Sequence, residues 1–80
     1  RDFIFNIGIY HEKQGNFEEA AINYHMAADR GDNEARYILG QWYEEGKGVK
    51  KDPKIAQKFY LAAAVEGHAL SQNNLGYMLL

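Results

Sequence analysis

The sequence predicts an all-α protein, an α-solenoid in which antiparallel helix pairs stack in about two and a half repeats, with five helices. Three observations support this prediction. Apolar residues recur with i, i+3 and i+4 spacing, and no stretch alternates as a strand would. The chain matches itself at a shift of 36 residues, and small residues fall at the same places in each copy. An ordinary helical bundle explains the first observation but not the other two.

The expected helices span residues 2–14, 17–30, 33–45, 53–66 and 69–80. The first is indicated by Phe3, Ile4, Ile7 and Tyr10, whose spacing places them on one helix face. Asn16 stands three residues before Glu19, which resembles a capping box at the start of the second helix.

The third and fifth helices follow from the repeat. Gly40 aligns with Gly8 at a shift of 32 residues and with Gly76 at a shift of 36. Gly31 and Gly67 follow alanine-rich runs, where a left-handed glycine most readily ends a helix. The fourth helix begins at Asp52-Pro53, since aspartate accepts hydrogen bonds at a helix start and proline has the helical φ preset.

Recurring small residues predict where the helices approach each other. Each glycine inside a helix costs about 1 kcal/mol relative to alanine. Such a glycine, repeated at this cost, is best explained by close approach of a neighbouring helix. The same role is expected for the alanines of the second helices, with a tyrosine filling the space between pairs. The residues concerned are Gly8, Gly40, Gly76, Ala20, Ala27, Ala56, Ala63, Tyr24 and Tyr60.

Residues 38–72 carry a family resemblance. The segment "ILGQWYEEGKGVKKDPKIAQKFYLAAAVEGHALSQ" resembles the Sel1-like repeat family, within the tetratricopeptide-like superfamily. The first unit has the shorter, tetratricopeptide-like turn Gly15-Asn16-Phe17. The resemblance implies a helix pair in 1–32, a Sel1-like pair in 33–68, and the first helix of a further, truncated repeat in 69–80. It also implies a scaffold or adaptor that binds other proteins.

In such arrays the first helix of each pair lines the concave face. The stripe around each helix glycine is therefore expected to bind a peptide or partner protein, and its carboxylates, with Glu45, suit an apolar or basic peptide. These residues are Phe5, Ile9, Glu12, Tyr37, Gln41, Glu44, Asn73, Tyr77 and Leu80. Met78, Leu79 and Leu80 would leave an apolar face open at the last helix, which predicts self-association or contact with a following repeat.

The loop "GKGVKKDP" at residues 46–53 raises an alternative. It lacks the hydroxyl residue and the preceding strand of a phosphate-binding loop, so we expect a turn in which Gly46 ends a helix and Val49 packs on the core. Its lysines usually mean a solvated rim. They could instead dock an acidic or nucleic-acid partner, although the net charge of −2 disfavours nucleic acid. The basic patch comprises Lys47, Lys50, Lys51, Lys54 and Lys58.

Catalytic chemistry is disfavoured. The chain has no cysteine, no threonine and one serine, Ser71, so nucleophiles are almost absent. His11, His25 and His68 lack the helical partners of a metal site. A hydrolytic enzyme is therefore the least favoured class, and no metal, cofactor or small-molecule substrate is expected. No apolar run is long enough to span a membrane. The compartment is left open.

Overall fold

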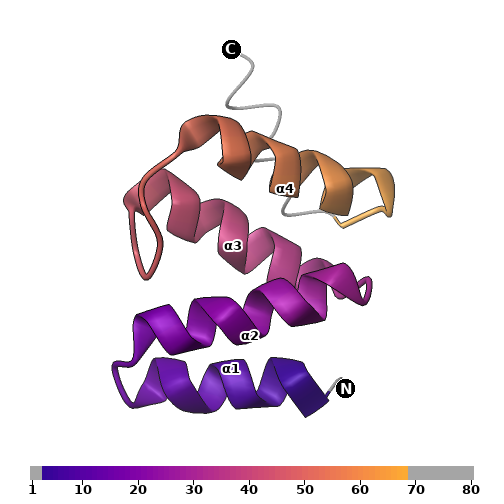
Figure 1. Ribbon diagram of the computed structural model, residues 1–80. Coiled ribbons are helices and arrows are strands. Elements are labelled where there is room, and N and C mark those ends of the chain that lie inside the picture. The colour runs from indigo at the N-terminus through magenta and orange to yellow at the C-terminus, as the bar shows by residue number, and fades with distance from the viewer. Residues whose placement is uncertain (1–2, 69–80) are drawn as a thin grey trace.

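The computed structural model describes residues 3–68, and these form four helices and no strand. They are α1 (Phe3–Lys13), α2 (Phe17–Asp29), α3 (Asn33–Glu45) and α4 (Pro53–Val65). Figure 1 shows them stacked one above another in chain order, with α1 and α4 at opposite ends of the stack. The all-α class is confirmed for this part of the chain. The predicted fifth helix, and with it Asn73, Tyr77 and Leu80, lies outside the described residues.

The helices of each pair meet where a glycine of the first helix faces a tyrosine of the second. A Cβ atom built on Gly8 would lie 2.7 Å from Cε1 of Tyr24, and one built on Gly40 would lie 2.5 Å from Cε1 of Tyr60. Both tyrosines are completely buried. The prediction that these glycines permit close approach of a neighbouring helix is therefore confirmed.

Consecutive pairs are joined through Trp42 of α3. Its ring makes edge contacts with Tyr24 at 5.3 Å and with Phe17 at 5.9 Å between centroids. The Tyr24 ring thus contacts both its own pair and the next one. The alanines expected to permit close packing of the second helices are fully buried: Ala20, Ala27, Ala56 and Ala63.

The helix ends follow the predicted chemistry with one exception. Gly31 and Gly67 have positive φ angles, as expected. The Asp52 carboxylate accepts hydrogen bonds from the backbone N–H groups of Lys54 and Ile55, at 3.1 and 3.2 Å. The prediction of a capping box at Asn16 is wrong. Asn16 has ψ 72° rather than the extended backbone of a cap, and its side chain makes no cap hydrogen bond.

The loop between α3 and α4 folds back onto α2. A Cβ atom on Gly48, whose φ is +70°, would lie 2.5 Å from the carbonyl oxygen of Phe17, so only glycine fits there. Val49 packs against the core, and the backbone N–H of Asp52 donates to the carbonyl oxygen of Tyr43 at 2.8 Å. The expected turn with an inward-facing Val49 is confirmed.

Candidate functional site

Each buried tyrosine donates a hydrogen bond to a glutamate of the paired helix. Tyr24 Oη donates to Oε1 of Glu12 at 2.6 Å, and Tyr60 Oη donates to Oε1 of Glu44. Both glutamates stand four residues after the helix glycine, so the first helices repeat a glycine and a carboxylate in the same register. The facing tyrosine follows the glutamate by 12 residues in the first pair and by 16 in the second. Glu12 and Glu44 therefore each have one carboxylate oxygen engaged within a helix pair. Sequence reasoning assigned them to a partner and missed this contact, although a tyrosine and a glutamate recur in both units of the sequence.

Phe5 belongs to the core. Only 3% of its surface is exposed, and its ring packs on Tyr24 with centroids 5.3 Å apart. The prediction that Phe5 lines an exposed stripe is wrong, because Tyr24 fills the space above Gly8 and lies against the ring. Ile9 is half-buried and also packs against the core.

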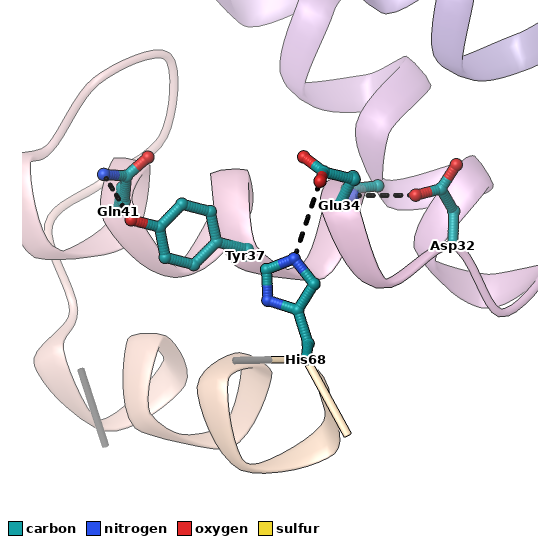
Figure 2. Close-up of polar contacts among 6 residues, drawn as sticks. Asp32, Glu34, Tyr37, Gln41 and His68 are labelled. Carbon is teal, nitrogen blue, oxygen red and sulfur yellow. Dashed lines mark hydrogen bonds and ion pairs between the residues drawn. The ribbon is translucent and has the colours of Figure 1, made fainter. Parts of the chain in front are cut away.

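Tyr37, the equivalent of Phe5 in the second unit, is half-buried and lies in a polar cluster. Its ring packs on Tyr60 at 5.9 Å and on His68 at 5.3 Å. Gln41 Nε2 donates to Tyr37 Oη at 3.3 Å, and His68 Nε2 lies 3.6 Å from Oε1 of Glu34. Figure 2 shows these side chains together beside α3. We call Glu34, Tyr37, Gln41 and His68 the Tyr37 cluster.

The start of α3 positions this cluster. Asp32 accepts a hydrogen bond from the backbone N–H of Ala35 at 3.0 Å, which fixes the first turn that carries Glu34 (Figure 2). From there Tyr37 and Gln41 follow on one stripe of the helix, four residues apart. The cluster offers ring surface, an amide and a carboxylate that is half exposed. Such groups can bind a peptide by contact and hydrogen bonding.

The predicted basic patch divides in two. The Lys47 ammonium lies 4.6 Å from the ring centroid of Phe17 and 5.2 Å from that of Trp42, so it packs over the core aromatics. The other lysines of the patch are exposed: Lys50, Lys51, Lys54 and Lys58. Sequence reasoning counted Lys47 with them because the fold-back of the loop was not encoded in any local spacing.

A groove of about 500 Å³ lies between α2, α3 and α4, and we call it the α2–α4 groove. Tyr43 follows Tyr37 by six positions in α3, so their side chains point about 120° apart around the helix. The groove is therefore on a different side of α3 from the Tyr37 cluster. Its lining residues are His25, Ala28, Asp29, Arg36, Tyr43, Ile55, Lys58, Phe59 and Ala62.

An aromatic cluster forms the inner part of the groove. The Tyr43 and Phe59 rings stack at 5.8 Å with 16° between their planes, and the His25 ring meets both with its edge. His25 Nε2 and Tyr43 Oη are 2.9 Å apart. Burial lowers the pKa of His25, which nearby Asp29 partly opposes. Burial also raises the pKa of Tyr43, and the Asp52 carboxylate adds to that rise.

A smaller hollow of about 460 Å³ adjoins this groove and shares His25 with it. It lies between α2 and the loop after α3, with Glu18, Ile22 and Lys50 on its walls. Within residues 3–68 no group of three or more histidine, cysteine, aspartate or glutamate side chains is placed to hold a metal ion. No helix in the same range has the length and apolar character needed to cross a membrane.

Comparison with protein families gives a consistent match over the chain. The family model described as Sel1 repeat matches residues 4–32, 33–68 and 69–80. A solved structure of c5321, a protective antigen of uropathogenic Escherichia coli with an SLR fold, superimposes with a TM-score of 0.87 and 34% identity. That match covers 94% of this chain and 17% of the antigen.

Two similar proteins have names that describe a regulator and a protein-binding factor. An exopolysaccharide production negative regulator of Rhizobium leguminosarum is 32% identical over 95% of this chain and 28% of its own length. The DAP3-binding cell death enhancer 1 of Rattus norvegicus is 38% identical over 86% of this chain and 14% of its own length. The chain thus spans less than a third of the length of each of these three proteins.

Proposed function

The chain belongs to the Sel1 repeat family, and on that premise we propose that it binds a peptide or partner protein on the face of α1 and α3 that carries the Tyr37 cluster. Sel1 repeat proteins are generally protein-interaction modules, and the family is typically a non-catalytic scaffold. A regulator and a DAP3-binding protein among the relatives support a role exerted through other proteins.

The observation that carries this proposal is the Tyr37 cluster. A half-buried tyrosine beside an amide and a carboxylate supplies apolar contact area and hydrogen-bonding groups at one place, which is typical of interface anchors. Glu34 and Glu45 are exposed on the same side of α3, about 60–80° from Tyr37 around the helix. Their carboxylates favour a peptide that carries a basic residue beside an apolar one.

Selection from a random peptide library against the chain tests this proposal. We expect enriched peptides to combine basic and apolar residues. Tyr37→Ala should then weaken binding by about tenfold or more, since truncating an interface anchor costs upwards of about 1.4 kcal/mol. Lys50→Glu with Lys51→Glu serves as the matched control and should leave the affinity of these peptides at or above that of the wild type. If Tyr37→Ala binds the selected peptides as the wild type does, this face is not the binding surface.

The alternative proposal is docking of an acidic or nucleic-acid partner through the lysine-rich segment 47–58. Four exposed lysines support it, whereas the packing of Lys47 on the core and the overall charge of −2 weaken it. Raising the salt concentration from low to physiological should weaken lysine-driven binding steeply, because condensed counterions are released from nucleic acid and exposed charges are screened.

A further inference from the structure

We propose that the α2–α4 groove is a second docking site, which takes an acidic peptide with one large apolar side chain between carboxylates. This site is independent of the Tyr37 cluster, since the two lie on different sides of α3. It also differs from a diffuse lysine surface, because only Lys58 of the predicted basic patch lines the groove.

The groove has an apolar receptor for the large side chain. The stacked Tyr43 and Phe59 rings, with the His25 edge against them, give a rigid aromatic wall drawn from three helices. The polar contact of 2.9 Å between His25 and Tyr43 holds two of these rings in place. Ile55 and Ala62 of α4 extend the apolar lining. A volume of about 500 Å³ lies within the usual range of about 300–1,000 Å³ for ligand pockets.

The charges around this receptor favour carboxylates. Among residues 3–68 the lining carries two cations, Arg36 and Lys58, and one carboxylate, Asp29. The Asp52 carboxylate acts on Tyr43 from nearby without lining the groove. Arg36 Nη1 donates to Oδ1 of Asn33 at 2.8 Å, which positions the guanidinium. A guanidinium has five N–H donors, so Arg36 retains the capacity to bind a carboxylate with a pair of parallel hydrogen bonds.

The charges that line the α2–α4 groove suit an acidic peptide better than they suit nucleic acid. A polyphosphate backbone would bring a row of negative charges past Asp29 and, in the adjoining hollow, past Glu18. In the part of the chain that the structure describes, two cations line the groove, so little counterion release would compensate this repulsion. A peptide can place one or two carboxylates beside Arg36 and Lys58 and insert an apolar side chain against Phe59.

Peptide selection followed by fluorescence anisotropy tests the proposal. A random peptide library is selected against the chain, and labelled peptides from the enriched pool are titrated onto wild type and variants. Lys58→Glu and Arg36→Gln should each raise Kd by about tenfold, the effect of losing about 1.4 kcal/mol. Lys54→Glu is the matched control, because it reverses an exposed charge one turn earlier in α4 and does not line the groove. It should change Kd by no more than about twofold, as exposed charges contribute little.

The outcomes separate this site from the other surfaces. Enriched acidic peptides with an aromatic or large aliphatic residue, sensitive to Lys58→Glu and indifferent to Tyr37→Ala, would support the groove. Equal loss in Lys54→Glu and Lys58→Glu would overturn it in favour of a diffuse lysine surface. Competition by a short oligouridine would overturn it in favour of nucleic acid. Enrichment only of basic peptides whose binding depends on Tyr37 would overturn the proposal of a groove site and leave the proposed function standing. A selection that enriches no peptide would overturn both proposals.

Discussion

The strictest test of the stacked architecture is the substitution of Gly40 by alanine. In an isolated helix this change stabilises by about 1 kcal/mol. Here the new Cβ would lie 2.5, 2.7 and 2.8 Å from three ring atoms of Tyr60, whereas ordinary van der Waals contacts lie at 3.4–4 Å. The ring must therefore move by about 1 Å, and it has no free space because it is completely buried.

The expected loss follows from three contributions. Overpacking a filled core costs about 1–3 kcal/mol. Displacement of the ring also loosens the hydrogen bond from Tyr60 Oη to Glu44, which is worth about 1.5 kcal/mol or more because the acceptor is charged. The gain in helix propensity offsets about 1 kcal/mol. The net expectation is a loss of about 2 kcal/mol, or a fall in Tm of about 8–16 °C for a domain of this size.

Urea unfolding followed by far-UV circular dichroism measures this loss. Gly8→Ala is an internal comparison, since its Cβ would lie 2.7 Å from the nearest ring atom of Tyr24, and it should destabilise by less than Gly40→Ala. In a Tyr60→Leu background, Gly40→Ala should become neutral or stabilising, because the ring that it meets is gone. A wild-type midpoint for Gly40→Ala, or a loss that persists unchanged with leucine at position 60, would refute close packing of α4 on this glycine.

Other variants test single contacts. Tyr60→Phe should cost about 1.5–3 kcal/mol in urea unfolding, because it removes a hydroxyl that donates to a charged carboxylate, and a loss near zero would contradict that contact. Asp52→Ala should lower the free energy of unfolding by about 1 kcal/mol, because it removes a helix cap, whereas Asn16→Ala should lower it by less, because Asn16 makes no cap hydrogen bond. Thermal unfolding that ranks the two variants in the opposite order would contradict the observed caps. Because burial lowers the pKa of His25 below 6.5, the folded state binds this proton more weakly than the unfolded state does. The contribution of His25 to stability should be fully present above about pH 6.5 and be lost as the pH falls through the lowered folded-state pKa. His25→Gln should therefore flatten the decline of the unfolding free energy with falling pH. An unchanged dependence of that free energy on pH would contradict the lowered pKa of His25.

Much of the fold could be predicted because the repeat makes local and long-range signals agree. Gly8 and Gly40 stand inside helices at a cost that only close packing explains, and the tyrosines that fill the space above them align at a shift of 36 residues. The helix bounds within 3–68 were predicted to within one residue, because left-handed glycines and the Asp52-Pro53 start mark them chemically. At Asn16 the residue type was right for a cap, but its backbone conformation was not.

The candidate site was harder to predict, since exposure depends on which neighbour covers a residue. Phe5 and Tyr37 occupy equivalent places, yet the first is buried and the second is half-buried. Lys47 has the sequence context of a solvated lysine, and only the fold-back of its loop brings it over the rings of Phe17 and Trp42. The contact of Lys47 with Phe17 joins residues of different helix pairs, so no helical spacing indicates it.

The positions that recur in the repeat identify the residues that build the fold rather than those of the candidate binding surfaces. Residues that recur in both units build the stack, and these include the glycine, tyrosine and glutamate of each pair. Several residues of the two candidate surfaces stand instead where the units differ. At a shift of 32 residues Gln41 matches an isoleucine, and at a shift of 36 the groove residues Lys58 and Phe59 match Ile22 and Asn23. A search for repeated positions therefore finds the residues that build the stack, whereas a binding surface has to be sought in the departures from the repeat, which the folded chain gathers on two sides of α3.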